Sequence, residues 1–449
     1  MGTDRCDRIK IVVCLLGGLI LYACSATFAA SPRPVENAAL LYYQAGLGLE
    51  HPDYRRPEAI LRSLDVQGRD RAELEEATRL YRHGFWQGEC SDANVPEVHL
   101  QWLDGEDRER AIKEFLDRAD CRLAVEQIMA ATRIPQCDWG LWVSGRWFPG
   151  RLVAKSQRRV VLFLWEYTRV LMADGRYGEA IEAIEAFQRF SCHTGDETYV
   201  MWIMSSTAQS QAFGLAHRLL STMPPDVEML GRLESALAET KGPGWHPRQT
   251  LTKWGDMMLA SRQASIDRHS NWQEAFIALL AEDFPDWESG KAEGIIEHMA
   301  GPQQVLDLAR QAHRRFVDSA IEILESDATY HAKHKQIVQL AEKFIAGAEA
   351  GDVSAFVVNV GGVEPYYRFH INGLAMAHAV KAAIAIYRIK ATTGQLPASL
   401  PADLPKDPYS GRDFEYQVTD GGFRLTCRAP AIDWGVDDNP RQFDFKIVK

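Results

Sequence analysis

The sequence predicts a mainly α-helical protein: an array of helical hairpins, repeat-like but degenerate, followed by a small α+β module of one long helix and a three-stranded antiparallel sheet. Up to about residue 350, apolar residues recur at helical spacing in segments that end at Gly, Pro or Asp. Near the C-terminus, apolar and polar residues alternate with a period of two, which is typical of strands with one buried face. We therefore expect a helical domain over residues 31–350 and a helix-and-sheet module over residues 351–449.

The clearest helical hairpin lies at residues 157–190. Residues 157–173 carry one apolar face at helical spacing and stop at Asp174-Gly175, and residues 177–190 carry a second such face. The two helices are expected to pack antiparallel across a tight turn. The stretch from Gly175 to Ala180 resembles the turn of a tetratricopeptide repeat, but it does not recur at that family's period of about 34 residues.

Other elements follow from the same two periodicities. Helices are predicted over residues 71–83, 107–119, 122–132, 206–220, 227–239, 252–267, 272–281, 303–325, 332–349 and 367–392. Extended segments are predicted over residues 356–360, 414–418, 423–427 and 443–447, with a hairpin turn at Asp420-Gly421. The apolar face of such a small sheet needs the long helix to cover it.

The first thirty residues predict export, as a signal peptide or an N-terminal anchor. Arg5, Arg8 and Lys10 precede an apolar run at residues 11–23, which is short for the roughly 20 residues that span a membrane. Three outcomes stay open: cleavage after Ala29, acylation of Cys24 as in a lipoprotein, or an uncleaved anchor at residues 11–23. All three place the chain in the periplasm or cell envelope, with membrane contact only through this segment.

Composition narrows the classes of partner. The 449 residues are 46% hydrophobic and 25% charged, enough to bury a full core. A net charge of -11, without a long basic run, excludes a nonspecific nucleic-acid binder. The cysteines are too few for a disulfide framework; Cys121 and Cys137 are either a disulfide pair or two buried thiols.

The densest aromatic segment is the candidate ligand-binding site. Trp139, Trp142 and Trp147 lie with Arg146 between Gly and Pro residues rather than in a periodic element. Aromatic faces beside charged groups can stack on a sugar or hold a peptide, whereas core packing beneath a loop is the alternative.

No motif predicts catalytic residues. The chain has no H-E-x-x-H zinc motif and no G-x-S-x-G nucleophile elbow. Cys192 and His193 are adjacent in sequence, which does not aim one side chain at the other. His331 and His334 lack a third ligand placed to complete a metal site.

One C-terminal stretch resembles a known family. Leu396-Pro397, the run Leu404 to Gly411 (an L-P-x-D-P-aromatic-x-G pattern) and Phe414 to Tyr416 are similar to the globular part of type II secretion major pseudopilins. The resemblance covers about 75 residues and implies a long helix leading into a three-stranded sheet. Pseudopilins are small and lack a long helical region before this module, so filament assembly does not carry over. The overall layout also resembles large exported bacterial proteins.

The resemblance also implies a calcium site near the last strand. The matching residues here are Asp433, Asp437 and Asp438, with the hard oxygen ligands that calcium prefers; a solvated acidic loop is the alternative. Asp407 is expected to shape its turn, and no other cofactor is expected. Together these observations predict an exported cell-envelope protein that binds or scaffolds a protein or glycan partner. The alternative is an envelope hydrolase acting on glycan or peptide.

Overall fold

The structure is a computed structural model that describes part of the chain. The described residues are 37–47, 105–137, 139, 149–195, 199–238, 247–267, 269–283, 293, 294, 296, 297, 299–349, 363–430 and 440–448. Predictions at residues 1–30, 71–83 and 356–360 lie outside them. Within them the predicted fold class is confirmed, because helices precede a three-stranded antiparallel sheet that follows a long helix.

The described elements are helices of ten or more residues and three strands. The helices are α2 (Ala38–Leu47), α6 (Gly105–Leu116), α7 (Ala119–Ala131), α8 (Pro149–Ala173), α9 (Tyr177–Thr194), α10 (Tyr199–Leu220), α11 (Val227–Ala238), α12 (Pro247–Ile266), α13 (Trp272–Asp283), α15 (Pro302–Glu325), α16 (Tyr330–Glu349) and α17 (Val363–Thr393). The strands are β1 (Glu415–Thr419), β2 (Gly422–Pro430) and β3 (Pro440–Lys446). Most helices extend a few residues beyond the predicted bounds, chiefly at their N-termini.

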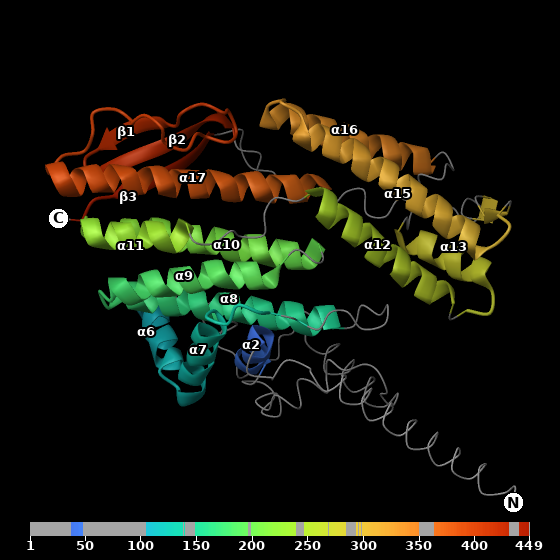
Figure 1. The fold of residues 1–449 in the computed structure, drawn as a ribbon, viewed down its shortest axis with the longest axis horizontal. Helices are drawn as coiled ribbons and strands as arrows, with labels where there is room; N and C mark the ends of the chain where they lie inside the picture. Colours follow the sequence, from blue (N-terminus) through green and yellow to red (C-terminus); the bar gives the residue numbers. More distant parts are fainter. Residues whose placement is uncertain are drawn as a thin grey trace, which may run out of the picture.

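Helices α8, α9, α10 and α17 form the centre of the protein, each packed against the next (Figure 1). The predicted inward face of α9 is confirmed, since Ile181, Ile184 and Phe187 are buried. Gly175 turns the chain between α8 and α9 with a φ of 72°, a conformation that costs glycine little. Helices α2, α6 and α7 cover the other side of α8, at the bottom of the view (Figure 1).

Helices α12, α13, α15 and α16 lie toward one end of the molecule (Figure 1). They contain a second hydrophobic cluster, in which Leu259 of α12, Phe276 of α13 and Leu306 of α15 are buried. Helices α12 and α15 approach closely at Gly255, where an added Cβ would lie 1.9 Å from Nε2 of His313. Glycine is therefore a packing requirement at this crossing.

The C-terminal sheet has the order β1-β2-β3 and packs on α17 (Figure 1). Residues of β2 alternate as the sequence predicts: Phe423 and Leu425 are buried, and Phe423 stacks on Phe445 of β3 with ring centroids 5.0 Å apart. Tyr387 of α17 meets Phe423 edge-on at 5.5 Å. The long helix thus covers the apolar face of the sheet.

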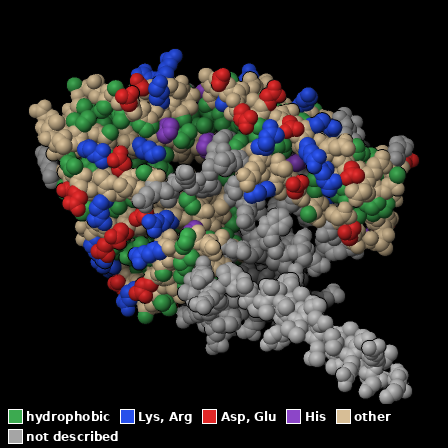
Figure 2. Space-filling view, viewed as in Figure 1, with side chains coloured by type: hydrophobic (Ala, Val, Ile, Leu, Met, Phe, Trp, Pro, Cys, Tyr) green, Lys and Arg blue, Asp and Glu red, His purple; other side chains and the backbone are tan. Residues whose placement is uncertain are grey.

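Helix α17 is the one described helix that is long and apolar enough to cross a membrane. Half of its most apolar stretch is buried inside the protein, which is also the pattern of a core helix. On the face in view, acidic and basic side chains are interspersed (Figure 2).

Candidate functional site

A groove of about 300 Å³ lies between α7 and α9. Its apolar lining residues are Met129 and Ala186. Its other lining residues are polar or charged: Thr132, Arg133, Glu182, Glu185 and Arg189. The volume is at the small end of the range for ligand sites, about 300 to 1,000 Å³.

The charges of the groove are partly paired. Arg189 donates a hydrogen bond to Glu185 one turn earlier on α9, and Arg232 of α11 lies 3.4 Å from Glu182. Arg133 is exposed, and its guanidinium makes no hydrogen bond or ion pair with another residue of the described part of the chain. The groove therefore presents two cationic and two anionic side chains, with Arg133 as the cation open to a ligand.

The groove is supported by a buried aromatic cluster. Trp139 stacks on Tyr42 of α2 with ring centroids 5.4 Å apart, and it meets Phe190 of α9 edge-on at 6.4 Å. Its indole Nε1 donates to the carbonyl of His193 over 2.6 Å, and its own carbonyl accepts from the Tyr43 hydroxyl over 3.0 Å. These contacts fix the chain that follows α7 against the end of α9.

Trp139 is a core residue. The residue is 3% exposed; its ring stacks on Tyr42 and meets Tyr43 edge-on, and its N–H group donates to the His193 carbonyl. A ligand has no open face of this ring to stack on, so the core-packing alternative holds for Trp139. The other predicted ligand-binding residues, Trp142, Arg146 and Trp147, lie outside the described residues and stay predictions.

His193 and Tyr42 are paired in the same cluster. The Tyr42 hydroxyl and His193 Nδ1 form a hydrogen bond of 2.8 Å. Burial and the nearby charge of Arg189 lower the pKa of His193 to about 4, although a hydrogen bond to the Ile134 backbone opposes the shift. Burial raises the pKa of the Tyr42 phenol well above its ordinary value. Both groups are therefore neutral at pH 7.

A thiol nucleophile at Cys192 is not supported. Burial raises the pKa of its thiol, whereas a nucleophilic cysteine needs a lowered pKa. The adjacent His193 ring is engaged by Tyr42. Of the two alternatives for Cys121 and Cys137, the structure has no disulfide between them.

Among the described residues, no group of three His, Cys, Asp or Glu side chains is placed to hold a metal ion. His334 instead pairs with Glu364 of α17 over 2.7 Å, and Glu364 also accepts from Arg368 over 2.6 Å. The predicted calcium ligands Asp433, Asp437 and Asp438 lie outside the described residues, and that site stays a prediction.

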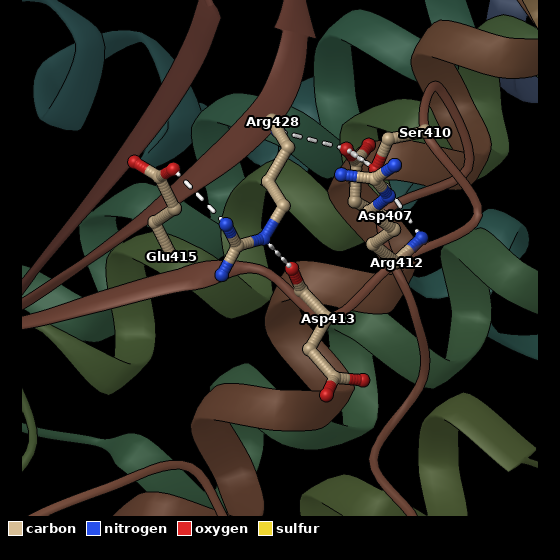
Figure 3. A network of polar contacts seen from close by, with 6 residues as sticks. All are labelled: Asp407, Ser410, Arg412, Asp413, Glu415 and Arg428. Atoms are coloured by element: carbon tan, nitrogen blue, oxygen red, sulfur yellow. Dashed lines mark hydrogen bonds and ion pairs between the residues drawn. The ribbon is translucent and has the colours of Figure 1, made fainter.

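The Asp407 carboxylate organises the turn before the sheet (Figure 3). It accepts hydrogen bonds from the backbone N–H of Tyr409 over 2.9 Å and the hydroxyl of Ser410 over 2.6 Å. It also accepts one from the backbone N–H of Arg428 on β2, over 2.9 Å. Arg428 in turn donates to the Asp413 carbonyl and lies 3.3 Å from Glu415. The prediction that Asp407 shapes its turn is confirmed.

Sequence reasoning missed the groove. Glu182, Glu185 and Arg189 fall at i, i+3 and i+7, which places them on one face of α9. The spacing can be seen in the sequence, but it is equally typical of a solvent-exposed helix face. The opposite wall of the groove, from Met129 to Arg133, lies about fifty residues earlier in the chain. Nothing in the sequence indicates that these residues pack beside α9.

No protein-family model, no curated protein and no solved structure gives a significant match to this chain.

Proposed function

We propose that this chain is an exported component of the bacterial cell envelope that binds or scaffolds a protein partner through the groove between α7 and α9. The N-terminal residues support export, since a basic start precedes an apolar run and small residues. The observation that carries the binding role is the lining of the groove, which combines two apolar residues with two arginines and two glutamates.

A peptide segment suits this lining better than a glycan. Side chains of both signs close together complement a segment that also carries both signs, and the apolar lining residues Met129 and Ala186 can contact an aliphatic side chain. A neutral glycan would leave the exposed Arg133 without a charge partner. We therefore take a mixed-charge protein segment as the partner and treat a glycan as an outcome of the test.

The alternative function is an envelope hydrolase. Glu182 and Glu185 line the groove, but they lie one turn apart on the same helix face. Glycoside hydrolases place their two carboxylates on opposite sides of the bond that is broken. The groove geometry therefore favours binding over glycan hydrolysis.

Binding is tested on arrays that carry mixed-charge peptides and glycans side by side. We expect the purified full-length protein to bind peptides in which Lys and Glu are three or four residues apart. Arg133→Glu should weaken binding at least about tenfold, which corresponds to about 1.4 kcal/mol. The control is Arg314→Glu, the same charge change at an exposed position on α15. Equal binding by both variants, or retention of glycans alone, would overturn the groove as the peptide site.

Export is tested separately by cell fractionation and intact mass. A soluble envelope species that starts after residue 29 supports a free binding protein. A membrane-bound species, acylated at Cys24 or full-length, supports a tethered scaffold. A cytoplasmic full-length species contradicts export.

A further inference from the structure

We propose that β1, the edge strand of the C-terminal sheet, pairs antiparallel with β1 of a second copy of this chain. The two three-stranded sheets then join into one continuous sheet. The inference goes beyond peptide binding, because no residue of β1 lines the groove between α7 and α9. It depends on the open backbone edge of β1 and on the order of its five side chains.

The backbone of β1 has one paired side and one open side. Thr419 lies opposite Gly422 across a two-residue turn, and in such a hairpin this flanking pair exchanges backbone hydrogen bonds. The pattern alternates along the strand, so the N–H and C=O groups of Tyr416 and Val418 point away from β2. Within the described part of the chain, these outward groups have no hydrogen-bond partner.

The opposite edge of the sheet, at β3, is occupied. His217 of α10 donates through Nε2 to the Asp444 carbonyl over 2.8 Å, and the Lys446 N–H donates to the Ser221 hydroxyl over 3.4 Å. The Tyr387 hydroxyl of α17 donates to the Lys446 carbonyl over 2.5 Å. In the order β1-β2-β3, β3 contacts α10 and β1 lies on the side away from it (Figure 1). The helices therefore satisfy one edge of the sheet and leave the edge at β1 open.

Strand β1 lacks the features that usually protect an edge. Such features are proline, lysine, a bulge or a charged side chain on the inward face. The strand contains neither proline nor lysine, and its register with β2 has no shift. Its inward-facing residues, Tyr416 and Val418, lie opposite the buried Leu425 and Phe423. Val418 is nevertheless 51% exposed, so an apolar side chain stands uncovered at this edge.

The occupant that fits this edge is a second copy, because β1 is complementary to itself about Gln417. In an antiparallel pair centred there, Tyr416 lies opposite the partner's Val418, and their outward N–H and C=O groups form the hydrogen bonds. An aromatic residue opposite a β-branched one is a favourable cross-strand pair. Glu415, the one charged residue of the strand, lies opposite the partner's Thr419, so no like charges meet. This is the antiparallel register that pairs all five residues.

The first test is sedimentation velocity of the full-length protein. A pairing of five-residue strands is a small interface, so we expect a dimer with a Kd of about 10 μM or weaker. Val418→Pro removes the outward N–H but none of the hydrogen bonds to β2, and it should abolish the dimer. Val418→Thr, the matched control, keeps the N–H and the branched side chain and should still dimerise.

The second test is cross-linking with copper phenanthroline as the oxidant. In the proposed register, the two copies of residue 417 form a non-hydrogen-bonded pair with Cα atoms about 4.5 Å apart, within reach of a disulfide. Gln417→Cys should therefore give a covalent dimer. Thr419→Cys is the matched control, since its two copies would lie about 14 Å apart along the strands. We expect at least about tenfold less dimer from it, with the unmodified protein giving the background of the native cysteines.

Three results would overturn the proposal. One is a protein that remains monomeric at about 500 μM, well above the expected Kd. Another is equal cross-linking of Gln417→Cys and Thr419→Cys. The third is a monomer whose edge binds an added strand peptide of different sequence, which would assign β1 to another protein. The first and third use the unmodified chain and do not depend on the folding of a variant, and none bears on the peptide-binding test at Arg133.

Discussion

The carboxylate of Asp407 accepts a hydrogen bond of 2.9 Å from the backbone N–H of Arg428, which joins the turn before the sheet to its central strand. Asp407 is completely buried and also accepts from Tyr409 and Ser410. One side chain therefore satisfies donors from two segments that lie 21 residues apart. This link holds the turn that precedes the sheet against the central strand β2.

Asp407→Ala should strongly destabilise the module. The substitution leaves two backbone N–H groups and one hydroxyl without their acceptor, and each unsatisfied buried group costs about 1 to 3 kcal/mol. Because the Ser410 hydroxyl and the Arg428 N–H are only partly buried and can bond to water instead, we expect a loss of about 2 to 4 kcal/mol in the free energy of unfolding, measured by urea unfolding followed by circular dichroism.

Asp413→Ala is the matched control. Asp413 accepts from Arg428 through its backbone carbonyl, which alanine retains, and its side chain is exposed. Its effect on the free energy of unfolding should stay within about 0.5 kcal/mol. Equal losses for the two variants would contradict a special role for the Asp407 carboxylate.

Most of the fold could be predicted because its signals are local. The apolar faces of α9 and β2 are visible in a few consecutive residues, and both are confirmed by burial. Helix starts were less accurate: α8 begins at Pro149 rather than at residue 157, because polar residues there interrupt the apolar periodicity without ending the helix. Helix α2, whose residues are almost all apolar or aromatic, has no polar face to reveal its period.

The candidate site could be predicted much less well. Aromatic residues are dense both in cores and at binding surfaces, and only tertiary contacts with Tyr42 and Phe190 show that Trp139 belongs to the core. The groove depends on α7 meeting α9, a long-range contact that no local pattern specifies. Arg133 was therefore not distinguishable from other exposed arginines.

Gly255→Ala should disrupt the packing of α12 on α15. An added Cβ would lie 1.9 Å from Nε2 of His313, whose ring is buried and donates to the Leu251 carbonyl over 3.1 Å. Forced repacking of this kind costs about 1 to 3 kcal/mol or more. Thermal unfolding should show the loss as a lower Tm.

Two comparisons isolate the cause of that loss. Gly231→Ala on α11 adds a methyl group with no atom within 4 Å, so it should stabilise by about 0.5 to 1 kcal/mol through better helix propensity. Combining Gly255→Ala with His313→Ala should cost less than the sum of the single changes. Strict additivity would show that the His313 ring is not the obstacle.

His193 should make stability depend on pH between about 4 and 6.5. Burial and Arg189 lower its pKa to about 4 in the folded protein, against 6.5 as the ordinary value. In this interval the unfolded chain binds a proton that the folded protein does not, so stability falls as pH decreases and levels off below about 4. Because the ring is partly exposed, we expect the free energy of unfolding to fall by about 2 kcal/mol, less than the free energy that corresponds to the whole pKa shift.

The contribution of His193 is isolated by comparing variants across that pH range. Urea unfolding of His193→Gln should show a shallower loss of stability from pH 7 to pH 4 than the unmodified protein. Other histidines whose pKa is lowered, such as His217 and His313, titrate in both proteins and cancel in the difference. His269→Gln removes one histidine from an exposed turn and serves as the matched control. Parallel pH profiles for the unmodified protein and His193→Gln would show that the Tyr42–His193 pair is not the source of the dependence.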